Sequence, residues 1–237
     1  ITWWFGLPIS ASHSLIGGLI GAAVASSGFE IILRGKIELI LAFIVISPLV
    51  GTFAAFILMA LIIKIFRKQN ATYANRYFRR LQLLSAAAYS LSHGGNDAQK
   101  TMGIVAVLLF SSGYLGSEFY VPFWVAMMAH LAIALGTLAG GWRIIHTMGG
   151  KITKLDPMHG FGAETAGAAV IIGSTFFGIP VSTTHVIAGS IIGVGATRRL
   201  SAVRWGLARR IMWTWIITIP AASGMAAMLY FIFSLVM

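Results

Sequence analysis

An eight-residue pattern occurs twice in this chain, and its two copies lie far apart in the sequence. Gly6–His13 reads Gly-Leu-Pro-Ile-Ser-Ala-Ser-His, and Gly178–His185 reads Gly-Ile-Pro-Val-Ser-Thr-Thr-His. When residues 6–25 are aligned with residues 178–197, seven of the twenty positions are identical. Proline and glycine that interrupt apolar segments at matching places in two halves of a membrane protein are typical of the central site of a transporter. The chain is therefore expected to contain two related repeats.

Composition predicts that both repeats lie in a membrane. Hydrophobic residues make up 58% of the 237 residues, and charged residues only 10%, which is far more apolar than an ordinary soluble domain. Apolar runs of about 20 residues, the length that a helix needs to cross a bilayer, fill most of the chain. The net charge of +11 comes from short basic clusters between these runs. The positive-inside rule predicts such clusters, so the partner is the lipid bilayer and no nucleic acid is expected.

The basic clusters also predict the topology. Five cations follow the apolar run at residues 37–66 and five more follow residues 158–197, whereas the loop at residues 111–121 has no Lys or Arg and is expected outside. Two further membrane spans are predicted, at residues 119–141 and 211–236. The segment 158–197 has both ends inside, and its short halves favour a re-entrant hairpin over two full spans. The two repeats are thus expected to enter the membrane from opposite faces.

A polar stretch, Ser92–Thr101, interrupts the apolar run at residues 81–112. Its sequence, Ser-His-Gly-Gly-Asn-Asp-Ala-Gln-Lys-Thr, is too polar for contact with lipid, so it must face protein or water. Asn96 and Asp97 follow two glycines, as at a helix N-terminus, where free backbone N–H groups can receive an anion. Ser182–Thr184 has the same character. The sequence therefore predicts broken helices at both places.

Asp97 and Glu164 are the two acidic residues within apolar segments. An ionisable group inside a span is energetically expensive and is a candidate functional residue. The alternatives are an internal ion pair with Lys100 or a cap for Asp97, and a capping or interfacial role for Glu164. His13 and His185 occupy equivalent repeat positions, either as ligands or as hydrogen-bonded core residues. The histidines lack metal-ligand spacing and the chain has no cysteine, so no metal site is expected.

The segment Ser92–Gly103, together with the two Gly-x-Pro-x-Ser copies, resembles the inorganic phosphate transporter (PiT) family over essentially the whole chain. The resemblance implies an all-α, inverted-repeat secondary transporter with broken helices and re-entrant hairpins. It implies symport of inorganic phosphate with Na⁺ or H⁺, sometimes as a complex with a divalent metal, and neither enzyme activity nor a resident cofactor. A homodimer in the cell membrane, a bacterial inner membrane, is also implied.

The resemblance further implies which residues bind substrate. In the Asn-Asp motif they are Asn96, Gln99, Lys100 and Thr101. In the first hairpin tip they are Ser10 and Ser12, and in the second hairpin tip they are Ser182, Thr183 and Thr184. Asp97, with Asn96, is expected to couple transport to the cation. A carboxylate beside phosphate is repulsive by several kcal/mol unless positive charge lies between them. A proton, Na⁺ or Lys100 could supply that charge.

One departure from the family pattern concerns the first repeat. A family member should have a first Asn-Asp motif ahead of the first hairpin tip, and none precedes Gly6 in this sequence. We therefore expect a C-terminal fragment of a longer transporter. Residues 1–80 would complete the first repeat and the connecting span. Residues 81–237 would form the second repeat, consisting of the Asn-Asp broken helix, a span, the re-entrant hairpin and a final span.

Two other functions compete with phosphate symport. A sulfate permease of the same fold would use the same hydroxyl and backbone donors. Phosphate at neutral pH can still donate a proton to a buried carboxylate such as Asp97, whereas sulfate cannot, and this difference favours phosphate. An intramembrane enzyme that uses Asp97 or His93 lacks a paired second carboxylate or a nucleophile.

Cysteine labelling tests the topology, and the chain has no native cysteine to interfere. A cysteine placed near Gly116 should react with an impermeant maleimide from outside. Cysteines near Gln69 or Ser201 should react only after permeabilisation, because basic loops stay in the cytoplasm. Labelling of all three positions from the same side would contradict the inverted-repeat topology.

Overall fold

The computed structural model describes residue 2 and residues 4–236, and every regular element in this part of the chain is helical. The α-helices, in chain order, are α1 (Ala11–Ser27), α2 (Arg34–Phe66), α3 (Ala71–Ser111), α4 (Phe123–Ala139), α5 (Trp142–His146), α6 (Pro157–Phe176), α7 (Thr183–Arg198) and α8 (Trp205–Ser234). Short helical turns lie between them: η1 (Phe29–Ile31), η2 (Thr147–Lys151) and η3 (Leu200–Ala202). The prediction of an all-α protein is confirmed.

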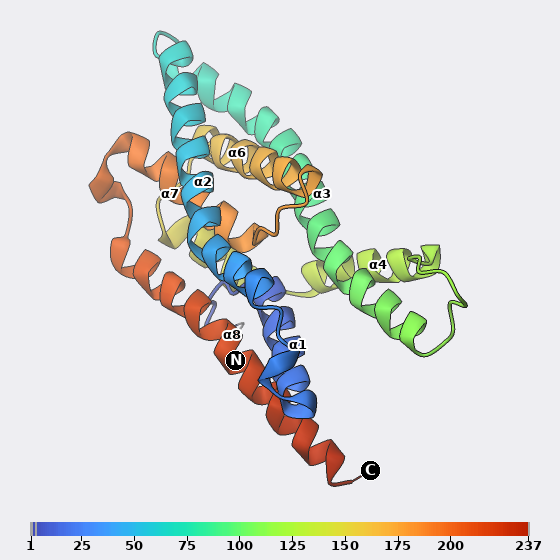
Figure 1. Ribbon diagram of the computed structural model, residues 1–237. Helices are drawn as coiled ribbons and strands as arrows, with labels where there is room; N and C mark the ends of the chain where they lie inside the picture. Colours follow the sequence, from blue (N-terminus) through green and yellow to red (C-terminus); the bar gives the residue numbers. More distant parts are fainter. Residues whose placement is uncertain (1, 3, 237) are drawn as a thin grey trace.

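The two repeats exchange helices. Helix α1 packs along α8, and α7 packs along α2 (Figure 1). The sequence offset that relates Gly6 to Gly178 also relates α1 to α7 and Pro48 in α2 to Pro220 in α8. The two packings are therefore the same interaction made twice. In Figure 1, α1 runs from the middle of the molecule toward its lower end and α7 toward its upper left, as inverted repeats require.

Glycine allows these helix pairs to reach backbone contact. A Cβ atom on Gly21 of α1 would lie 2.0 Å from the carbonyl oxygen of Ser223 in α8. A Cβ atom on Gly189 of α7 would lie 2.1 Å from the carbonyl oxygen of Pro48 in α2. These neighbours are backbone atoms that cannot rotate away, so only glycine fits. Small residues at helix interfaces are the usual means of close packing in lipid, where the hydrophobic effect does not drive helices together.

Hydroxyl groups hold the same two interfaces. Ser223 Oγ donates to the carbonyl oxygen of Gly17 at 2.8 Å, and Thr52 Oγ1 donates to that of Gly189 at 3.0 Å. Gly17 and Gly189 are equivalent positions of the two repeats. Each interface therefore has a hydrogen bond to a backbone carbonyl at the equivalent position of its repeat, although the donors stand at different positions of the two partner helices.

The segment predicted as a hairpin forms two helices, α6 and α7, that pack on each other. Gly178 lies in the turn between them at φ +65°, a left-handed conformation that glycine adopts without strain. Ten of the 16 residues of α7 are buried, so this helix lies inside the molecule. Helix α6 packs on α2 and α3 at the same time (Figure 1).

The predicted break at Asn96 and Asp97 is wrong. Helix α3 continues without interruption from Ala71 to Ser111, so the motif lies in its middle and the backbone N–H groups there are not free to bind an anion. The polar side chains do not need a break, because one face of α3 packs against α6 and another borders a half-open cavity. Two glycines in succession lower helix propensity, and tertiary contacts outweigh that cost.

A second difference concerns the segment after residues 119–141, where the sequence predicts a loop with Arg143 and Lys151. In the structure α4 ends at Ala139, and the chain continues as helical turns from Trp142 to Lys151 with a bend of 67°. Gly141, at φ +95°, makes this bend possible. The broken helix of this protein therefore lies here and not at the Asn-Asp motif.

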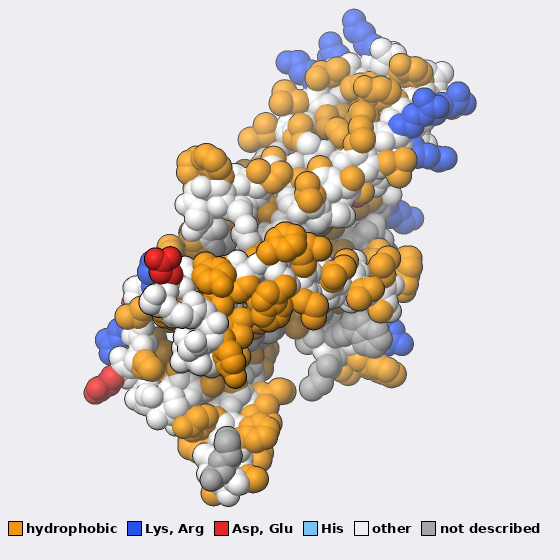
Figure 2. Space-filling view, turned by 90° about the vertical axis from the view of Figure 1, so that its right-hand side faces the viewer, with side chains coloured by type: hydrophobic (Ala, Val, Ile, Leu, Met, Phe, Trp, Pro, Cys, Tyr) orange, Lys and Arg blue, Asp and Glu red, His pale blue; other side chains and the backbone are white. Residues whose placement is uncertain are grey.

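Two helices, α2 and α8, are long and apolar enough to cross a membrane, and α4 with its bent continuation would make a third span. Figure 2 shows hydrophobic side chains over much of one face, with Lys and Arg gathered at the end where α2 turns into α3. Apolar sides with charge at the ends are the distribution that a bilayer imposes. The protein is accordingly an integral membrane protein.

Replacing Gly21 tests the close packing of α1 on α8. Gly21→Ala should destabilise the solubilised protein by about 1–3 kcal/mol, because the added methyl group forces the two backbones apart. Gly18→Ala is the matched control on the same helix, since a Cβ atom there meets nothing within 4 Å. Thermal unfolding in detergent measures both. Equal stability of the two variants would contradict the close contact.

Candidate functional site

The two tips meet in the middle of the molecule. Thr184 Oγ1, from the second tip, donates to the carbonyl oxygen of Ile9 in the first tip at 3.2 Å. The imidazole rings of His13 and His185 lie side by side, with 4.8 Å between their centroids. Because these two histidines are equivalent positions, the approximate two-fold axis that relates the repeats passes between their rings.

Serine caps the helix that follows each tip. Ser10 Oγ accepts from the backbone N–H of His13 at 3.2 Å, and Ser182 Oγ accepts from that of His185 at 3.3 Å. A cap of this kind stabilises a helix by about 1 kcal/mol. Both serines therefore act as N-caps. Both serines are buried, and each hydroxyl can still donate its own hydrogen.

Lys100 of α3 joins the Asn-Asp motif to both tips. Its Nζ donates to Asn96 Oδ1 at 2.6 Å and to Ser12 Oγ at 2.7 Å. It also lies 3.3 Å from Asp97 Oδ1 and 3.4 Å from the carbonyl oxygen of Val181. One ammonium group therefore contacts four oxygen atoms from three segments that are far apart in the sequence.

Donors surround the carboxylate of Asp97. His93 Nε2 lies 3.1 Å from Asp97 Oδ2, and Thr183 Oγ1 lies 3.3 and 3.4 Å from the two carboxylate oxygens. Beside it, Asn96 Nδ2 donates to Thr175 Oγ1 of α6 at 2.8 Å. Both polar residues of the motif are thus tied to the hairpin, Asn96 as a hydrogen-bond donor and Asp97 as an acceptor.

A half-open cavity of about 570 Å³ adjoins this cluster. Its polar lining includes five of the predicted residues: Ser12, Asp97, Lys100, Thr101 and Thr184. Gln99 does not line it; it is exposed and faces a groove beside the turn at residues 178–181. His93 and Thr137 also line the cavity, and sequence reasoning assigned them no binding role. For Thr137 no sequence signal distinguishes it from other hydroxyls on apolar helices.

The other candidates have structural contacts. Glu164 accepts from Ser85 Oγ at 2.6 Å where α6 packs on α3, away from the cavity. His185 stacks on Trp215 at 3.9 Å, and Trp215 Nε1 donates to the carbonyl oxygen of Pro8 at 3.0 Å. This packing favours the core role for His185. Among the described residues, no three His, Cys, Asp or Glu side chains gather as a metal site would need.

The fold and the site define a class of protein. Two inverted helix pairs meet at a polar centre that holds an ion pair and a cavity within an apolar helical protein. Sites of secondary transporters have this arrangement, with helix termini and polar side chains at the interface between repeats.

Comparisons with known proteins agree with that class. A sequence model of the "Phosphate transporter family" matches residues 1–226. A "Probable low-affinity inorganic phosphate transporter" of Rhizobium meliloti is 58% identical over 236 residues, which are 100% of this chain and 71% of the relative. The Bacillus subtilis protein of that name is 44% identical, with the same two coverages. The chain therefore belongs to the phosphate transporter family, and, like its relatives, it is a transporter and not an enzyme.

A solved structure supports the fold. "The sodium-dependent phosphate transporter" matches with a TM-score of 0.84 over 98% of this chain and 75% of that chain, at 23% sequence identity. The likeness confirms the predicted fold class. At this identity it carries information on the fold alone.

Proposed function

We propose that the protein carries inorganic phosphate across the cell membrane in symport with protons. The observation that carries this proposal is the position of Lys100, whose ammonium group lies between the carboxylate of Asp97 and the two tips. Phosphate, bound beside the tips, would share the positive charge of Lys100 with Asp97. The homodimer and the bacterial inner membrane implied by the family resemblance belong to the same proposal.

The donors around the cavity suit a tetrahedral oxyanion. Lys100 offers a charge-assisted hydrogen bond, and the hydroxyls of Ser12, Thr101 and Thr184 line the same cavity. Helices α1 and α7 both begin at the tips, and a helix N-terminus favours negative charge through its free N–H groups and its dipole. These elements supply donors from both repeats to one anion.

The oxygen atoms around Lys100 favour the proton over Na⁺ as the coupling ion. A hard cation takes carboxylate, amide, hydroxyl and backbone carbonyl oxygens as ligands. These are the four kinds of oxygen that Lys100 Nζ contacts, at Asp97, Asn96, Ser12 and Val181. Because the ammonium occupies this ligand set, Lys100 acts as a fixed substitute for a bound Na⁺.

Proton coupling follows from the single charge of Lys100. While Asp97 is ionised, it holds the ammonium in an ion pair of zero net charge, and an arriving phosphate finds no uncompensated positive charge. A proton on Asp97 releases Lys100 to pair with phosphate, which changes the interaction by several kcal/mol in a site of low dielectric constant. Proton and phosphate therefore bind together and leave together. His93, 3.1 Å from Asp97 Oδ2, is the neighbouring group that can pass the proton.

Variants of Asp97 and Thr184 should separate coupling from binding. In proteoliposomes holding the full-length gene product, Asp97→Asn should abolish gradient-driven accumulation, because its side chain cannot carry the proton. Thr184→Ala removes a hydroxyl that lines the cavity, and it should weaken phosphate affinity by about 1–3 kcal/mol through a lost donor. Thr197→Ala, at the other end of α7 and bonded only to Val194, is the control and should transport normally. If Asp97→Asn keeps its proton dependence, the coupling role is wrong.

Substitution of Lys100 tests the coupling ion. Uptake by the unmodified protein should follow a pH gradient and should be unchanged when choline replaces Na⁺. Lys100→Asn removes the ammonium, leaves the surrounding oxygen ligands and adds an amide oxygen, so it should make phosphate uptake depend on Na⁺. Lys100→Met also removes the charge but adds no ligand, and it should be inactive with either cation. Na⁺-dependent uptake by the unmodified protein would overturn the proposal.

A further inference from the structure

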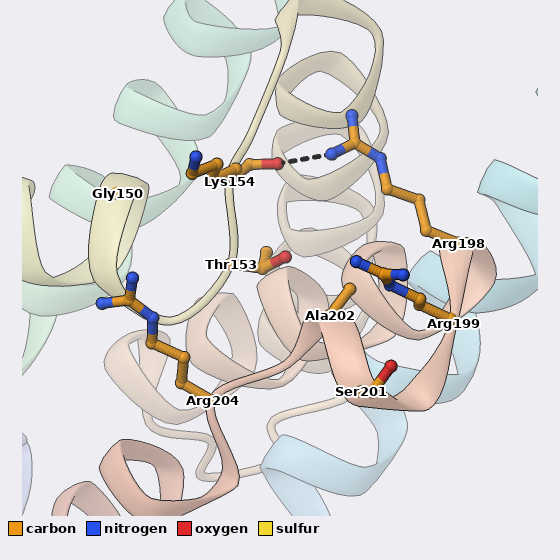
Figure 3. Close-up of a pocket in the computed structure, with 8 residues that line it drawn as sticks. All are labelled: Gly150, Thr153, Lys154, Arg198, Arg199, Ser201, Ala202 and Arg204. Carbon is orange, nitrogen blue, oxygen red and sulfur yellow. Dashed lines mark hydrogen bonds between the residues drawn. The ribbon is translucent and has the colours of Figure 1, made fainter.

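A second pocket lies away from the transport site, between the segment that leads into α6 and the segment that joins α7 to α8. Its volume is about 550 Å³. The lining contains four cations and two hydroxyls: Lys154, Arg198, Arg199, Arg204, Thr153 and Ser201. Figure 3 shows Lys154 and Arg204 on one side of Thr153, with Arg198 and Arg199 on the other. No residue lines both this pocket and the cavity beside Asp97.

One of the four cations is neutralised within the protein. Arg198 pairs with Asp156 and donates to the carbonyl oxygen of Lys154 at 2.9 Å (Figure 3). Partial burial raises the pKa of Asp156, but hydrogen bonds from His159 and the charge of Arg198 outweigh it and hold the pKa well below its usual range. Asp156 is therefore ionised at neutral pH. Its single negative charge compensates the charge of Arg198.

The other three cations have no carboxylate partner. None of the ion pairs found among the described residues includes Lys154, Arg199 or Arg204. Like charges that converge on one hollow repel each other unless an anion lies between them. The positive-inside rule accounts for basic residues in cytoplasmic loops, but it does not require them to surround a pocket.

The floor of the pocket is rigidly held. Ile152, Thr153 and Val203 are buried, and the backbone N–H of Arg204 donates to the carbonyl oxygen of Ile152 at 2.9 Å. This hydrogen bond joins the two segments that form the pocket. The cations therefore project from two segments that a backbone hydrogen bond holds together.

We propose that this pocket is a second anion site, which binds a phosphate group. Arginine forms bidentate hydrogen bonds with phosphate oxygens, and three cations can balance a phosphate dianion. The group can belong to free inorganic phosphate or to the headgroup of an anionic lipid, since basic pockets on the cytoplasmic side of membrane proteins bind such headgroups. Both sources present the same chemistry to the pocket.

The position of the pocket suits a role in regulating transport. This regulatory role rests on the proposed function, whereas phosphate binding in the pocket does not. Helix α6 begins at Pro157 and α7 ends at Arg198, so the pocket lies at the base of the hairpin whose tip borders the transport site. A bound phosphate group would tie that base to the start of α8. Phosphate accumulated in the cytoplasm would thereby restrain the hairpin and slow further uptake.

Two double variants with the same change in net charge test the site. Arg199→Gln/Arg204→Gln removes the unpaired arginines of the pocket, and Arg209→Gln/Arg210→Gln removes two arginines of α8 that do not line it. Equilibrium dialysis of the delipidated full-length protein with radiolabelled inorganic phosphate measures the number of sites. We expect the α8 variant to bind phosphate with the same stoichiometry as the unmodified protein, and the pocket variant to bind phosphate at one site per chain at least tenfold more weakly.

Native mass spectrometry of the protein released from phosphatidylglycerol vesicles and from phosphatidylcholine vesicles identifies the source of the phosphate group. If the ligand is a lipid, the unmodified protein and the α8 variant retain phosphatidylglycerol and the pocket variant loses it. Equal phosphate stoichiometry and equal lipid retention in the two double variants would overturn the proposal. Failure of the proposed transport function would instead appear as loss of proton-driven uptake in the unmodified protein, whatever the stoichiometry.

Discussion

The backbone contact of α1 with α8, and of α7 with α2, is the constraint on which the rest of the structure depends. Glycines such as Gly21 and Gly189 let carbonyl oxygens approach to distances that any side chain would prevent. Because the contact is made twice, the helix after each tip is fixed in the same way and the tips meet at one point. Without it, the donors of the two repeats would not face the same cavity.

Helix α3 supplies the positive charge at the point where the two tips meet. A continuous helix places His93, Asp97 and Lys100 on one face, since residues three and four apart are neighbours on a helix surface. Lys100 then reaches Ser12 of one tip and Val181 of the other. A break at the motif would have supplied free N–H groups instead of this fixed ammonium. The site therefore depends on a side-chain cation where the sequence suggested backbone donors.

Charge is compensated differently at the centre and at the rim, the end of the molecule where Lys154, Arg199 and Arg204 line the basic pocket. At the centre, Asp97 and Lys100 compensate each other inside apolar surroundings, where an unpaired charge would be very expensive. At the rim, water screens the cations, so three of them tolerate the lack of a carboxylate.

The sequence by itself determined the features that depend on local chemistry. Ser10 and Ser182 cap the helices that follow them, and the apolar runs form helices. The repeated Gly-x-Pro-x-Ser pattern predicts two equivalent tips. Tertiary contacts decided the features that depend on distant partners. Packing on α6 keeps α3 unbroken despite two glycines, Gln99 turns away from the cavity, and Arg199 and Lys154 from two separate loops line one pocket. Local rules cannot anticipate these outcomes, because the energies that decide them come from residues far away in the chain.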